Sequence, residues 1–140
     1  MTPLHALAAV LLLWLGLLLG ISFLEAPVKF QAASLRRNVA LDVGRHVFRA
    51  SQWVQLGLAA IALAIFVHAG APRTAALWLG GLAALLLAQE LWLRPALDRR
   101  IQLIFQGGQP RGLAVHGLYI AADVGKAALL GTAAFTLLGA

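Results

Sequence analysis

The residues of this sequence whose types could do chemistry are carboxylic, amide and amine side chains that interrupt apolar stretches. They are Ser22, Glu25, Gln52, Gln55, Gln89, Glu90, Asp123 and Lys126. An intramembrane charge is costly, about +2.5 to +3.5 kcal/mol at a helix centre on insertion scales, so such groups should face the bundle interior and pair. We therefore expect a polar cluster that could bind a cation or relay a proton.

A structural role for this cluster is the main alternative. Its members could form hydrogen bonds between helices or stay hydrated near the membrane surface, and all lie within about three helical turns of the expected interface. Lys126 could pair with Glu90 or with Asp123, three residues before it. Glu25 and Lys29 are spaced for a local i, i+4 pair, although Pro27 lies between them.

The four histidines raise the question of haem, because two imidazoles from facing helices can bind haem b. His46 and His116 should lie at matched depth near the cytoplasmic ends of the second and fourth spans, which makes them weak candidates for such a pair. Any interfacial histidine would occupy the same places. We expect no cofactor, no metal site and, because no acid, base and nucleophile converge, no catalytic residue.

The composition identifies the elements that must position these residues. Of 140 residues, 61% are hydrophobic and 11% charged, against about 45–50% and about 25% in soluble domains. That apolar content, about 85 residues, matches four membrane helices of about 20 residues each. With no cysteine, a disulfide scaffold and thiol chemistry are excluded. We expect an all-α, integral membrane four-helix bundle forming a single transmembrane domain over residues 1–140.

Four apolar segments are the expected spans: residues 3–24, 50–69, 74–93 and 112–137. The first should be a true span rather than a signal peptide, because no Lys or Arg precedes Lys29 and residues 24–27 make a poor cleavage site. Fourteen residues follow Lys126 in the sequence, about 21 Å of helix, which is too short to cross a membrane. Lys126 should therefore lie within the membrane. Trp14, in mid-span, should be packed.

The basic residues predict the orientation. Only Arg73 lies beside the turn between spans two and three, whereas the two longer loops contain Lys29, Arg36, Arg37, Arg45, Arg49, Arg94, Arg99, Arg100 and Arg111. By the positive-inside rule these loops are cytoplasmic and both termini periplasmic, in a bacterial inner membrane. The net charge of +6 then indicates contact with the lipid bilayer and its anionic lipids, not with nucleic acid.

The loop segments have their own pattern. Leu35, Val39, Val43 and Val47 recur every four residues, and apolar residues of 97–105 repeat the pattern after Pro95. These amphipathic segments could lie in the membrane interface or extend the spans, and the prolines should kink or break the helices. An offset of 68 residues pairs Pro27 with Pro95 and Gly44 with Gly112. This match suggests two parallel helix-hairpin repeats, although chance similarity between apolar helices is a rival explanation.

Three short stretches resemble a known group of proteins. Residues 23–30, residues 43–48 and residues 115–119, together with Asp123 and Lys126, resemble uncharacterised bacterial four-helix membrane proteins, a group similar to the copper-resistance-D-like small membrane proteins of unknown function. The resemblance implies a four-span inner-membrane protein in which residues 27–30 and His116 matter, and it implies no activity. It gives no counterpart for His46.

These observations favour an accessory or interaction protein of the membrane, a homo-oligomer or a subunit of a larger complex, in which the polar cluster stabilises helix association. The alternatives are a small transporter or a proton or cation pathway, and then a haem- or quinone-binding redox protein. An enzyme is less favoured.

Overall fold

The described chain, residues 1–109 and 114–140 of a computed structural model, consists of four long helices without strands. The first is α1 (Pro3–Leu18), which continues through a π-helical segment η1 (Leu19–Glu25) into α2 (Ala26–Lys29). The second is α3 (Arg37–Ala69). The third comprises α4 (Arg73–Ala88), the π-helical segment η2 (Gln89–Leu93) and α5 (Arg94–Phe105), and the fourth is α6 (Ala114–Leu138). All four are long and apolar enough to cross a membrane, so the predicted fold class is confirmed.

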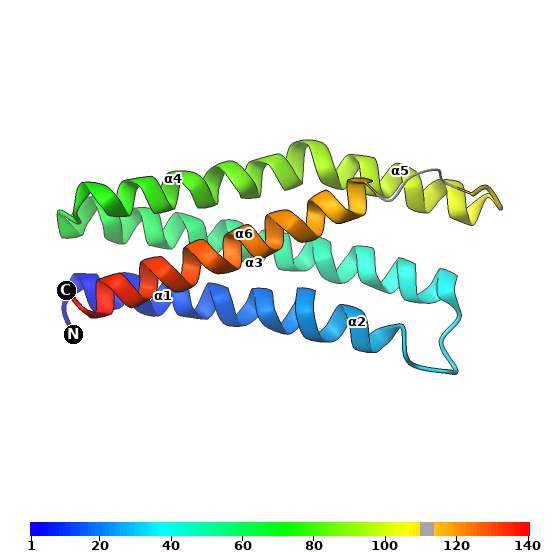
Figure 1. Ribbon diagram of the computed structural model, residues 1–140, viewed down its shortest axis with the longest axis horizontal. Helices are drawn as coiled ribbons and strands as arrows, with labels where there is room; N and C mark the ends of the chain where they lie inside the picture. The colour runs from blue at the N-terminus through cyan, green and yellow to red at the C-terminus, as the bar shows by residue number, and fades with distance from the viewer. Residues whose placement is uncertain (110–113) are drawn as a thin grey trace.

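The helices form an antiparallel bundle (Figure 1). α1 packs against α3 and α6, and α4 packs against the same two helices from the other side. Both termini and the turn before α4 lie at one end of the bundle, which we call the terminal end (Figure 1). The opposite end, called the basic end, contains α2, the first turns of α3 and α6, and α5 (Figure 1).

The hydrophobic core fills the terminal half of the bundle. Leu7, Leu11 and Leu18 of α1 pack with Leu82 of α4 and Leu130 of α6, all almost fully buried. Small residues lie among them where the backbones approach, namely Ala8, Ala62, Ala133 and Ala134. Large apolar side chains also cover the outside of the bundle, including Leu13, Leu77 and Phe135. A surface that is apolar all round is typical of a helix bundle surrounded by lipid.

At the basic end the helices extend beyond the expected spans. α3 begins at Arg37 instead of near residue 50, and the third helix continues to Phe105 instead of ending at residue 93. The amphipathic segments are therefore extensions of the spans and not separate helices in the membrane plane. Leu41 of α3 and Ile101 of α5 line one cavity between these extensions. The predicted apolar stripe of α3 is not the face that lines it, because Val39 and Val43 are exposed. Residues 112 and 113, at the expected start of the fourth span, lie outside the described residues.

The prolines change the helices without breaking them. Pro27 and Pro95 each follow a π-helical segment, η1 or η2, and the chain remains helical through both. A proline ring clashes with the carbonyl four residues earlier, at Phe23 or Leu91, and a wider π turn at that carbonyl relieves the clash. The two π segments occupy corresponding places in the two halves, which supports the repeat suggested by the 68-residue offset. Gly112, one member of that match, is outside the described residues.

The packing predicts different effects for two leucines of α1. Leu11 is 1% exposed in the core and Leu13 is 67% exposed on the outer surface. We expect Leu11→Ala to leave a cavity and lower the free energy of unfolding by about 2 kcal/mol or more, whereas Leu13→Ala should change it little. Thermal unfolding followed by circular dichroism in detergent measures the difference. Equal melting temperatures for the two variants would contradict this bundle.

Candidate functional site

A layer of buried polar side chains crosses the bundle between its core and its basic end. We call it the polar layer; its residues are Trp14, Ser51, Gln52, Gln55, Gln89, Asp123 and Lys126. All six of its members other than Trp14 are at most 4% exposed, and Trp14 is 1% exposed. Each of the four long helices contributes at least one member, because the side chains lie at similar depths along antiparallel helices.

Gln55 joins three of the four helices. Its Oε1 accepts a hydrogen bond from Nε1 of Trp14 in α1 (3.0 Å) and another from Nζ of Lys126 in α6 (2.8 Å). Its Nε2 donates within α3, to Oγ of Ser51 (3.2 Å) and more weakly to Oε1 of Gln52 (3.4 Å). One amide side chain therefore connects α1, α3 and α6, and both of its polar atoms have partners.

Asp123 and Gln89 connect α6 to the third long helix. Nζ of Lys126 lies 3.1 Å from Oδ1 of Asp123, three residues earlier in α6. The same oxygen accepts a hydrogen bond from Nε2 of Gln89 (2.8 Å), which also donates to the carbonyl oxygen of Tyr119 (3.2 Å). The ion pair is thus surrounded by amides, as a buried charge pair requires if its remaining hydrogen-bonding capacity is to be used.

The structure brings together most of the residues expected in the polar cluster, and separates three. Gln52, Gln55, Gln89, Asp123 and Lys126 meet. Glu25 and Glu90 do not join them. Glu25 pairs with Lys29 (3.1 Å) and Glu90 pairs with Arg94, in each case four residues later in the same helix. Of the two partners considered for Lys126, Asp123 is the one found. Ser22 lines a neighbouring cavity instead.

Trp14 and Ser51 are members of the layer that the sequence did not indicate as such. Trp14 is packed as expected, but its indole nitrogen is also a donor in the network. The sequence could have indicated this role for Trp14, because a buried indole N–H normally requires a hydrogen-bond acceptor. Its depth, opposite Gln55, could then have placed it in the layer.

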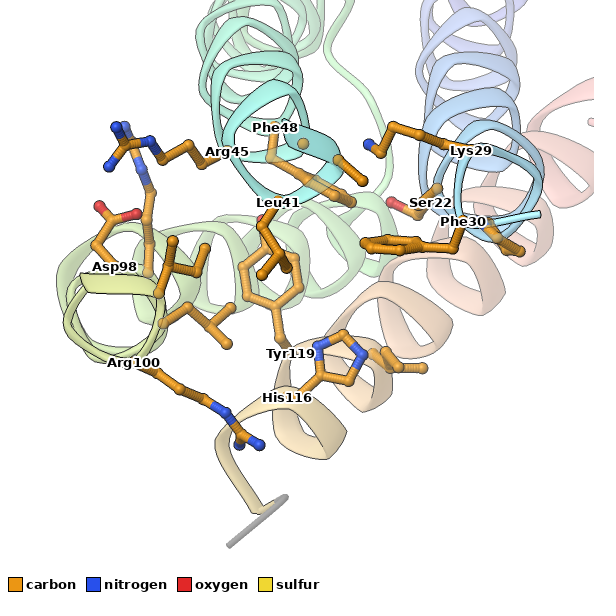
Figure 2. A pocket seen from close by; sticks show the side chains of 18 of the residues that line it. Ser22, Lys29, Phe30, Leu41, Arg45, Phe48, Asp98, Arg100, His116 and Tyr119 are labelled. Atoms are coloured by element: carbon orange, nitrogen blue, oxygen red, sulfur yellow. The ribbon is translucent and has the colours of Figure 1, made fainter. Parts of the chain in front are cut away.

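A cavity of about 630 Å³ adjoins the polar layer at the basic end (Figure 2). We call it the basic cavity. Asp123 belongs to both its lining and the polar layer. Leu41, Phe48 and Tyr119 meet in its centre, with Phe30 and Lys29 on one side and Arg45 and Asp98 on another (Figure 2). Its walls come from η1, α2, α3, α5 and α6, and the extensions of the helices past the expected spans form most of them.

The residues that line the basic cavity include more cations than carboxylates. Its lining contains two carboxylates, Asp98 and Asp123, and five cations: Lys29, Arg37, Arg45, Arg94 and Arg100. Three further carboxylates, Glu25, Asp42 and Glu90, pair with lining cations but do not line the cavity themselves. These pairs offset the charges of Lys29, Arg45 and Arg94 from outside the lining, so the excess of positive charge at the cavity is smaller than the lining residues alone suggest.

Local contacts fix two of these cations. The guanidinium of Arg45 lies 5.5 Å from the ring centre of Phe105 in α5, a cation–π contact across the cavity wall. The Lys29 side chain lies against the backbone of α3 at Gly44, where an added Cβ would be 3.1 Å from Nζ. The glycine thus allows α2 and α3 to approach with an ammonium group between them.

The two histidines proposed as haem ligands have different surroundings. His116 lines the basic cavity, whereas His46 is exposed on α3, with Nδ1 2.8 Å from the carbonyl oxygen of Asp42, and does not line it. The cavity therefore does not present these imidazoles as a facing pair. Within the described ranges, no group of three histidine, aspartate or glutamate side chains is placed to bind a metal ion.

This architecture defines a small polytopic membrane protein with a polar layer and a cavity at one end. Residues 9–102 match a family described as a domain of unknown function, DUF4149. The match covers about two thirds of the chain, which belongs to this family. It includes Trp14, Gln55 and Gln89 but ends before Asp123 and Lys126. No curated protein and no solved structure matches the chain.

The buried ion pair predicts an asymmetry between single and double substitutions. Lys126→Met leaves the Asp123 carboxylate buried without its cation, and breaking a buried pair costs about 3–5 kcal/mol. We expect a large drop in the melting temperature in detergent, and partial recovery in the double variant Asp123→Asn/Lys126→Met.

Lys29→Met is the matched control, because its partner Glu25 is only partly buried and such a pair contributes about 0–1 kcal/mol. If Lys126→Met melted at the same temperature as Lys29→Met, the polar layer would not stabilise the bundle.

Proposed function

We propose that the protein is a multi-pass protein of a bacterial inner membrane, with its basic end in the cytoplasm, that works as an accessory or interaction protein, as a homo-oligomer or within a larger complex. The observation that carries this proposal is the polar layer. Its amides, indole and ion pair bind one another and connect all four helices. Groups used in this way stabilise one helix arrangement, as a membrane scaffold needs.

A proton or cation pathway is less well supported by the same contacts. Among the described residues, the buried polar or charged side chains are Ser51, Gln52, Gln55, Gln89, Asp123 and Lys126. The core cluster between them and the terminal end consists of Leu, Ala and Trp. A pathway would need polar groups in that half, and Lys126 would also repel a cation at the layer.

A small transporter is the second candidate, and the basic cavity is the observation that favours it. The cavity leads from the basic end to Asp123, so a solute could enter the bundle as far as the polar layer. The excess of lining cations favours an anion over a metal cation. A lining of this charge does not support the binding of a copper cation. The resemblance to copper-resistance-D-like proteins is therefore supported only in that both are small membrane proteins.

The orientation can be tested by single-cysteine labelling, because the sequence has no cysteine of its own. We expect Ala71→Cys, in the turn at the terminal end, to react with a membrane-impermeant maleimide in intact bacterial cells. Ser34→Cys, in the loop between α2 and α3, should react only after the cells are opened. The reverse pattern would place the basic end outside.

Proton permeability separates the scaffold from the pathway. In liposomes containing the protein and a trapped pH-sensitive dye, we expect a valinomycin-driven potassium potential to move protons no faster than in protein-free liposomes. A leak that Asp123→Asn/Lys126→Met abolishes, in a variant whose helical circular dichroism spectrum is unchanged, would show that the layer conducts.

A further inference from the structure

The basic cavity has two kinds of wall, cationic and apolar. Cationic groups of Lys29, Arg37 and Arg45 lie beside apolar side chains of Phe30, Leu41 and Phe48. Its volume, about 630 Å³, is in the range of sites for small organic ligands, about 300–1,000 Å³. The polar layer does not use these groups, so the cavity is free for a role of its own.

The position of the basic cavity relative to the bilayer is given by two arginines of the third helix. Arg73 begins α4 at the terminal end, and Arg94, which lines the cavity, begins α5. The 21 residues from one to the other span about 31 Å at 1.5 Å per residue, which is the thickness of the hydrocarbon core, about 30 Å. If Arg73 marks one face of the hydrocarbon, Arg94 and the cavity lie at the other face, at the level of the lipid headgroups.

We propose that the basic cavity binds an anionic membrane lipid through its phosphate headgroup. The cations would bind the phosphate, as arginine and lysine do in charge-assisted hydrogen bonds. The aromatic and aliphatic walls would contact the glycerol and the first part of the acyl chain. Phe23 and Ile120 line the same cavity and are also exposed, so apolar surface continues from the cavity to the outside of the bundle.

Charge favours an anionic occupant. The lining carries five Lys or Arg side chains and two Asp side chains. Glu25, Asp42 and Glu90 offset three of these cations from outside the lining, so a small positive excess remains. Arg37 is exposed at the start of α3, and its guanidinium makes no hydrogen bond or ion pair within the described residues. A free phosphate ester would supply the same headgroup chemistry, but it would leave the apolar walls uncovered.

The test compares three probes on the purified full chain in dodecyl maltoside. They are oleoyl lysophosphatidic acid, oleoyl lysophosphatidylcholine with the same chain but no net charge, and glycerol 3-phosphate with the headgroup alone. We expect the lysophosphatidic acid to bind at least tenfold more tightly than either of the others, measured as Kd by microscale thermophoresis. Equal binding of the choline lipid, or of glycerol 3-phosphate, would overturn the proposal.

Two double variants locate the site. Arg37→Gln/Arg45→Gln removes two lining cations and should weaken the binding of lysophosphatidic acid at least tenfold. Arg36→Gln/Arg49→Gln removes the same charge from exposed positions that do not line the cavity, and should bind as the unaltered chain does. An equal loss in both variants would mean that lipid binds to the charged surface, and it would contradict a site in the cavity.

A third variant tests the cavity independently of charge. Leu41 lies in the middle of the lining side chains (Figure 2), so Leu41→Trp should narrow the cavity where they converge. We expect at least tenfold weaker binding of lysophosphatidic acid with an unchanged helical circular dichroism spectrum. Unaltered binding by a folded Leu41→Trp variant would overturn the proposal even if the arginine variants failed to fold.

Discussion

The desolvation of one ion pair constrains most of this structure. Lys126 and Asp123 lie within a bundle whose outer surface and far core are apolar, so their charges depend on each other and on neighbouring amides. Gln55 and Gln89 must approach them from α3 and η2, and Trp14 must then face Gln55 from α1. Because hydrogen bonds require specific distances and angles, this set fixes the rotation of every helix about its axis, which apolar packing alone fixes less strictly.

The prolines change the backbone of the helices in the same region. Each π segment ends just before a short helix that forms part of the cavity wall, and η2 itself contains Gln89. A π turn rotates the residues after it relative to an α-helix, so it changes which side chains face inward. Glu25 and Glu90, both expected in the layer, lie within these segments and pair along their own helices with Lys29 and Arg94.

The sequence was sufficient to predict four membrane-spanning helices and most of the polar layer, because polar side chains in apolar spans must face the interior of the bundle and pair there. It was insufficient to distinguish Asp123 from Glu90 as the partner of Lys126, since that choice depends on helix rotation. It also left the basic cavity unforeseen. The cavity exists because α3 and α5 extend past the expected spans, and their amphipathic pattern fits a helix on the membrane surface equally well.

The basic cavity and the polar layer are formed by the same long helices. α3 carries Leu41 and Phe48 in the cavity, and Gln55 follows them about four and two helical turns later. If α3 tilted as a rigid helix to widen the cavity, it would turn about the contacts of Gln55 with Trp14 and Lys126, so its two ends would move in opposite directions.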